Sequence, residues 1–177
     1  MAALNSVKDL LVDELKDLYS AEKQLTVALP KMQKGSSEPE LSEAFSSHLA
    51  ETRGQISRLE AIAEKMEIKL TGKKCKAMEE LIAEGSEALE EDGDETIIDI
   101  GVTGAARRVE HYQMAGYQCA IALAEQLGMR DVVELLNQTL KEEVATDNKM
   151  RDLGKKLALR SNQTSTENKP FNIEVTR

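Results

Sequence analysis

The apolar residues of this chain recur at intervals of three, four and seven, which is the spacing of one buried face on an α-helix. The first such segment spans about 5–34, and Ser6 can act as its N-cap. A Gly-Ser-Ser turn follows, and a second segment begins near Pro39, where proline is tolerated in the first helical turn, and runs to about Glu67. The pattern therefore predicts two helices in an antiparallel hairpin.

Three further helical segments follow this hairpin. A shorter one over about 74–90 lies in a long connection and ends at an acidic run. The next, over about 95–127, is apolar on most sides and rich in Ala and Gly, which is typical of a central, tightly packed helix. Gly128 ends that segment, and a last helix, with Asp131 as its expected N-cap, runs to about Leu159.

Two long hairpins joined by a long crossover form the connection pattern of ferritin-like bundles. The predicted fold class is therefore all-α, a ferritin-like antiparallel four-helix bundle whose long crossover carries an extra short helix. An unrelated four-helix bundle and an elongated coiled coil are the alternatives, and two short turns disfavour the coiled coil. We expect the bundle to occupy 1–160 and the polar, mostly patternless stretch 161–177 to form a C-terminal tail.

Four acidic residues stand at mid-helix positions on these apolar faces: Glu22, Glu51, Glu110 and Glu143. Residues equidistant from the turn of an antiparallel hairpin lie side by side. The midpoint of positions 22 and 51 is 36.5, inside the first turn, and that of positions 110 and 143 is 126.5, close to the second. Burying four carboxylates at one level is costly unless they share protons or bind cations. The pattern therefore predicts a pair of metal ions.

One helical turn from three of these glutamates stand further candidate ligands: His48, Gln113 and Asp147. Glu142 points away from the apolar face of its helix, so Glu143 is the predicted ligand of the two. Carboxylates with a few imidazole or amide groups suit iron or manganese, and we expect two such ions per chain. The alternatives are that the glutamates lie on the surface, and that His48 is a hydrogen-bonded core residue instead of a direct ligand.

Composition narrows the functional classes. The 177-residue chain has a net charge of −9 and a sequence pI of about 4.9, which disfavours nucleic-acid binding because phosphate contacts need a clustered basic surface. The N-terminal segment does not resemble a signal peptide, and no apolar run approaches the roughly 20 residues that span a bilayer. Cys75 and Cys119 form neither a metal-site motif nor a disulfide framework. We therefore expect a cytoplasmic protein that binds neither nucleic acid nor membrane.

Six segments resemble the YciF/YciE family of bacterial ferritin-like, stress-associated proteins, and the similarity is closer to the YciF branch. They are LYSAEKQLTVALPKM (18–32), SHLAETRGQISRLE (47–60), KCKAMEELIAEG (74–85), VEHYQMAGY (109–117), LAEQLG (123–128) and TLKEEVATD (139–147). The resemblance implies a homodimer and an iron or related di-metal site built from the four glutamates. The family commonly has glutamate where this chain has Gln113, and a neutral amide there would bind iron more weakly.

Two functional hypotheses follow. The first is a stress-response protein that binds two metal ions, with iron the expected metal, and oxidises Fe(II) with oxygen or peroxide. The second is a non-enzymatic structural or interaction module of the stress response, in which the metal is structural or absent. Whether the protein is an enzyme stays open at this stage. Metal content and oxidation of the bound metal by peroxide distinguish the two hypotheses.

Overall fold

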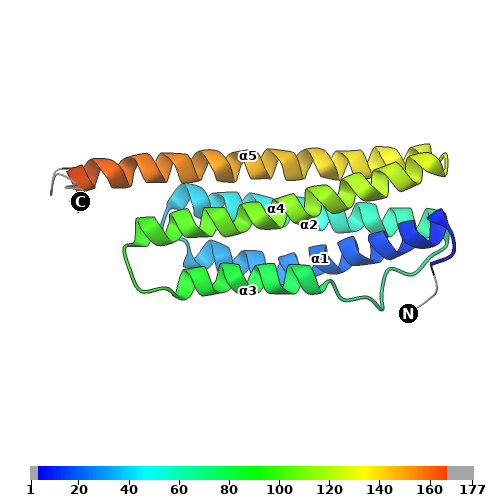
Figure 1. Ribbon diagram of the computed structural model, residues 1–177, viewed down its shortest axis with the longest axis horizontal. Helices are drawn as coiled ribbons and strands as arrows, with labels where there is room; N and C mark the ends of the chain where they lie inside the picture. The colour runs from blue at the N-terminus through cyan, green and yellow to red at the C-terminus, as the bar shows by residue number, and fades with distance from the viewer. Residues whose placement is uncertain (1–3, 167–177) are drawn as a thin grey trace, which may run out of the picture.

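The computed structural model describes residues 4–166, which form a bundle of long helices (Figure 1). Within that range the helices are α1 (Val7–Gly35), α2 (Pro39–Met66), α3 (Lys76–Glu90), α4 (Glu95–Gln126) and α5 (Arg130–Thr166). One antiparallel hairpin consists of α1 and α2, and the other of α4 and α5; α3 lies in the crossover, packed on α1 and α4. The predicted all-α four-helix bundle with a short helix in its crossover is confirmed.

Local signals place most of the helix ends where the sequence predicts them. The Oγ of Ser6 accepts a hydrogen bond from the backbone N–H of Asp9 and caps α1. Pro39 is the first residue of α2. Gly128, with a φ of +69°, occupies the left-handed conformation in the turn after α4, which glycine adopts without steric cost.

Two predictions about the last helix were wrong. Asp131 lies inside the first turn of α5 and is not its N-cap, and the helix continues past Leu159 to Thr166. Residues 161–166 of the predicted tail are therefore helical, and residues 167–177 lie outside the described part of the chain. The division of the chain into bundle and tail stays a prediction.

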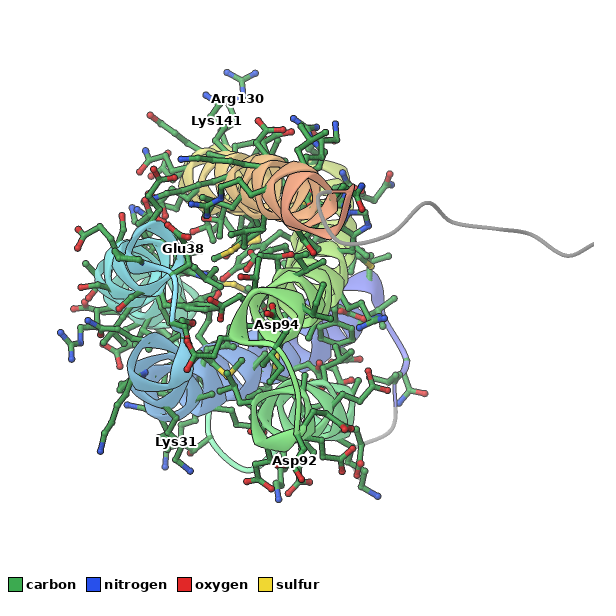
Figure 2. The ribbon with its side chains drawn as sticks, turned by 90° about the vertical axis from the view of Figure 1, so that its left-hand side faces the viewer. Lys31, Glu38, Asp92, Asp94, Arg130 and Lys141 are labelled. Carbon is green, nitrogen blue, oxygen red and sulfur yellow. The ribbon has the colours of Figure 1, made fainter. Side chains whose placement is uncertain are left out.

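Apolar side chains fill the bundle in two separate clusters. One contains Leu15, Ile62 and Leu136 and occupies the half that holds the turn between α4 and α5. The other contains Leu25, Phe45 and Met150 and occupies the half that α3 covers. Seen along the bundle, charged side chains such as those of Lys31, Arg130 and Lys141 point outward (Figure 2).

A buried carboxylate on α4 fixes the turn between α1 and α2. Asp99, on α4, is only 2% exposed. Its Oδ2 accepts a hydrogen bond of 2.7 Å from the backbone N–H of Glu38, and its Oδ1 accepts one of 3.3 Å from that of Ser37. The first hairpin is thereby fixed to α4, which sets the height of its side chains against those of the second hairpin.

Over residues 4–166, no helix combines the length and the apolar character that crossing a membrane requires. Both cysteines are free thiols, and Cys75 is buried while Cys119 is exposed.

Candidate metal centre

A layer of buried polar side chains separates the two apolar clusters. Glu22, Glu110 and Glu143 are at most 1% exposed, and His48 is 2% exposed. These four side chains come from four different helices, α1, α4, α5 and α2 respectively. Buried carboxylates require protonation or a compensating charge, because isolating an ionised carboxylate from water costs several kcal/mol. The layer therefore needs bound protons or a cation, and it contributes little to apolar packing.

Three of these side chains converge on one point. His48, Glu110 and Glu143 each offer a ligand atom, and the three atoms lie within 4.8 Å of one another. The Nδ1 of His48 is 3.3 Å from Oε1 of Glu110, and its Nε2 is 3.8 Å from Oε2 of Glu143. The imidazole thus lies between two carboxylates from the opposite hairpin. One nitrogen and two oxygen donors in this arrangement can surround a single cation.

The protonation states in this layer follow from burial. Burial raises the pKa of Glu110 to about 8. Burial also raises the pKa of Glu143 well above its ordinary value, and the neighbouring charge of Glu110 raises it further. Burial lowers the pKa of His48 to about 4, so its imidazole is neutral near pH 7, which is the form that binds metals. A cation entering the layer would therefore displace protons from carboxylates and none from the histidine.

Most of the buried side-chain oxygens in this layer accept no hydrogen bond from the described residues. They are Oε2 of Glu22, Oε2 of Glu110 and both carboxylate oxygens of Glu143, and Nε2 of His48 is also without a partner. Buried polar atoms without partners are rare in folded proteins and call for an explanation. Nitrogen and carboxylate donors suit iron, manganese or zinc, so the residues present fit a bound transition metal.

Glu22 lies next to this group of three and is held by two donors on α4. Its Oε1 accepts a hydrogen bond of 2.9 Å from Nε2 of Gln113 and one of 2.6 Å from the hydroxyl of Tyr117. Burial raises the pKa of Glu22 well above its ordinary value, and the charge of Glu143 adds to the increase. Gln113, a candidate ligand from the sequence, is thus brought to the layer, where its amide orients Glu22.

Glu51 lies at the edge of the layer and outside the group of three. Its side chain is half-buried, and its Oε2 accepts a 3.4 Å hydrogen bond from the hydroxyl of Thr146 on α5. Burial raises its pKa, as does the nearby charge of Glu142. The helix geometry explains this position: with 3.6 residues per turn, a residue three positions after His48 is rotated by about 60° around the helix axis. His48 therefore takes the inward position on α2.

Asp147 also lies outside the group of three. Its Oδ1 accepts a 2.7 Å hydrogen bond from Nε of Arg107 and lies 3.3 Å from Nε2 of His111, a side chain that is 59% exposed. Two residues of α4 therefore engage this carboxylate at the rim of the bundle. His111 follows Glu110 directly in the sequence and points away from the buried layer.

Sequence reasoning missed a polar contact between α2 and α5. Glu142 is half-buried and forms an ion pair with Arg58, whose Nε donates a 2.9 Å hydrogen bond to the hydroxyl of Thr139. The Nε2 of Gln55 also donates to Glu142, at 3.2 Å. The only signal in the sequence is that Arg58 follows Gln55 by three positions on the same side of the helix. The expectation that Glu143, and not Glu142, faces the interior agrees with their burial.

Comparison with known proteins gives consistent matches over most of the chain. Residues 6–162 match the family model described as Domain of unknown function (DUF892). The chain is 44% identical over 151 residues to protein YciF of Escherichia coli strain K12, which covers 85% of this chain and 91% of YciF. The crystal structure of that protein, described as a stress protein, matches with a TM-score of 0.85 and 43% identity over 88% of this chain and 98% of its own.

Two further solved structures are similar. YcfI from Rhodopseudomonas palustris, a protein proposed to be structural, has a TM-score of 0.80 and 41% identity over 83% of this chain and 94% of its own. A two-domain protein from Anabaena variabilis with DJ-1/ThiJ/PfpI-like and ferritin-like domains has a TM-score of 0.55 and 14% identity, covering 98% of this chain and 42% of its own. At that identity the likeness shows the fold alone. The predicted ferritin-like fold is thereby confirmed.

Proposed function

This chain belongs to the DUF892 family, and we propose that it binds a transition metal, with iron as the expected ion, between His48, Glu110 and Glu143. One observation carries the proposal: one imidazole and two carboxylates converge in a fully buried layer where most of their acceptor atoms lack hydrogen-bond partners. A cation would satisfy those atoms and offset the cost of burying the charges.

The protein residues have separate tasks in this proposal. Glu110 and Glu143 supply negative charge from adjacent helices, and His48 supplies a neutral nitrogen donor. Glu22, oriented by Gln113 and Tyr117, presents its free Oε2 beside them. Bound iron would supply one-electron redox chemistry towards oxygen or peroxide. Since YciF is described as a stress protein, we propose a role in the stress response.

We propose two iron or manganese ions per chain, and Glu22 and Glu51 are the candidate ligands that would hold the second. A specific observation favours a second candidate function. Glu51 is engaged by Thr146, and an amide occupies position 113, so the second ion has fewer ligands than the first. A single structural ion in a non-enzymatic module would agree with the structural role proposed for YcfI.

Anaerobic loading with Fe(II), followed by desalting, separates these possibilities. Two retained irons per chain that oxygen or peroxide then oxidises would support the redox function. One retained iron that resists oxidation would support the structural function, and no retained iron would contradict metal binding. Glu143→Gln should lower the amount of retained iron. Glu142→Gln is its matched control, because the two residues are adjacent but only Glu143 is fully buried.

We also propose that the protein is a homodimer in the cytoplasm that binds no nucleic acid. On the exposed side of α4, the small residues Gly101, Ala115 and Ala122 lie among larger polar residues such as Arg108 and Gln118, and the small residues would permit close approach of a second helix. Sedimentation equilibrium of the full chain tests the dimer. The net charge of −9 supports the absence of nucleic-acid binding.

A further inference from the structure

A cavity of about 30 Å³ lies beside the candidate metal centre, among α1, α2, α3 and α4. Two of its lining residues are the candidate ligands His48 and Glu110. The others are apolar or glycine, among them Leu29, Ile82, Gly85 and Ala105. One water needs about 10–15 Å³ of such space, so the cavity can hold a molecule of two or three heavy atoms.

The cavity extends from the metal centre towards the surface between α3 and α4. His48 and Glu110 mark its buried end, since both are at most 2% exposed. Leu81, Ile82 and Ala106, which also line it, are only partly buried and mark its outer end. A small molecule that enters between the crossover helix and α4 therefore reaches the imidazole and one carboxylate directly.

Small residues keep this space open. Gly85 is buried in the interior of α3, a position where glycine is unfavourable compared with alanine. A Cβ added there would lie 3.5 Å from Cε of Met32 and 3.7 Å from Cβ of Ala105, which is ordinary van der Waals contact. The backbone therefore has room for an alanine at this position, and a larger side chain would fill the cavity.

The chemistry of the wall selects the occupant. Apart from His48 and Glu110 at its buried end, the cavity wall is carbon, so ions, water and hydrogen peroxide would lose hydrogen bonds along most of it, whereas a small apolar molecule would not. We propose that this cavity binds dioxygen and delivers it to the side of the metal centre formed by His48 and Glu110. Delivery of dioxygen to the metal rests on the proposed redox function, and it makes dioxygen the oxidant. Occupation of the cavity can be measured without metal.

Dissolved dioxygen is paramagnetic and accelerates nuclear relaxation where it accumulates. In the full-length apo protein under oxygen pressure, the methyl groups of the buried Leu29 should relax faster than those of the similarly buried Leu136, in the other apolar cluster. Equal relaxation at the two places would overturn the inference. Gly85→Leu should remove the excess relaxation, and Ala83→Leu, which adds the same side chain on the exposed face of α3, should retain it. If Gly85→Leu does not fold, Gly85→Ala should lower the excess, and an unchanged excess would contradict the proposal.

The loaded protein gives the functional readout. Gly85→Leu should retain as much iron as the native chain and should oxidise it more slowly with dioxygen, while its rate with hydrogen peroxide stays the same. Unchanged oxidation by dioxygen, or equal slowing with both oxidants, would overturn delivery through the cavity. If the native chain retains no iron, the proposed function fails, and the relaxation measurement on the apo protein still decides whether dioxygen occupies the cavity.

Discussion

His48, Glu110 and Glu143 form a group that can bind a cation, and the two carboxylates carry protons when the cation is absent. Burial favours the neutral form of all three groups, so the pKa of Glu110 rises to about 8 and that of His48 falls to about 4. A divalent ion reverses this preference for the carboxylates because it supplies the missing positive charge. At the residue scale, metal binding is therefore a competition with protons at Glu110 and Glu143.

Removing a ligand from the group of three should affect binding more than removing one from its edge. Glu110→Gln is expected to weaken metal binding by about 10-fold or more, because a carboxylate that contacts the ion is replaced by a neutral amide. Glu51→Gln, at the half-buried edge, should weaken binding less. Titration of both apo variants with Mn²⁺ by calorimetry measures the difference. Equal losses in the two variants would place the ion midway between them and contradict the arrangement inferred here.

Gln113→Glu restores the residue that is common in the resembling family. It removes the hydrogen-bond donor to Glu22 and adds a buried carboxylate, so the apo protein should be less stable in urea, by about 1–3 kcal/mol. The same change should increase metal affinity, because it adds a charged ligand next to Glu22. An apo variant as stable as the native protein, with unchanged affinity, would show that position 113 does not face the metal centre.

At the scale of the helices, the contact between α4 and α5 is close at Gly154. A Cβ at this position would lie 2.6 Å from Oγ1 of Thr103, well inside van der Waals contact. Gly154→Ala should therefore destabilise the protein by about 1–3 kcal/mol through overpacking. Gly54→Ala is the matched control, because its Cβ would approach only Nη1 of Arg58, at 4.0 Å, and it should stabilise the protein by about 0.5–1 kcal/mol. Urea unfolding of both variants measures the contrast; destabilisation by both would contradict it.

The helices and their relative heights could be predicted from the sequence because both depend on local signals and on arithmetic. Apolar spacing defines each buried face, and the turn positions bring Glu22, Glu110 and Glu143 into one layer. The rotation of α2 about its own axis could not be predicted to within 60°, because His48 and Glu51 both border the apolar face of this helix. Only packing against the opposite hairpin selects the histidine for the interior.

The end of α5 shows a different limit of sequence reasoning. The polar composition beyond Leu159 indicates a tail, yet the helix continues to Thr166. A charged contact across the bundle holds the beginning of this part of the helix, because Arg160 pairs with Glu38, just before α2; one turn earlier, Lys156 pairs with Glu40 in the first turn of α2. Such contacts between distant segments leave no periodic pattern in the local sequence, so the helix end could not be read from it.

For the whole molecule, the buried carboxylates predict an unusual dependence of stability on pH. The folded-state pKa of Glu110, about 8, lies above its ordinary value of 4.5, so the folded apo protein keeps a proton that the unfolded chain releases. The contribution of Glu110 to the stability of the folded apo protein is therefore fully present below about pH 4.5 and is lost as the pH rises towards 8. His48 acts in the opposite sense, since its lowered pKa reduces stability as the pH falls from 6.5 towards 4.

Urea unfolding in the presence of a chelator should therefore show the apo protein losing stability between about pH 6.5 and 8, and Glu110→Gln should lose less. Saturating metal should abolish the loss, because the ion binds only the deprotonated carboxylates of the folded state. Apo stability that rises over this interval would contradict the protonation states assigned to the buried layer.

The location of the ion itself is the central claim, and anomalous X-ray scattering from a crystal of the Mn²⁺-loaded protein tests it most directly. We predict a peak bounded by His48 on α2, Glu110 on α4 and Glu143 on α5, within about 2.0–2.3 Å of their nitrogen and oxygen atoms. A fully loaded crystal with no peak in this layer, or with its only peak at the rim beside Asp147 and His111, would contradict the account.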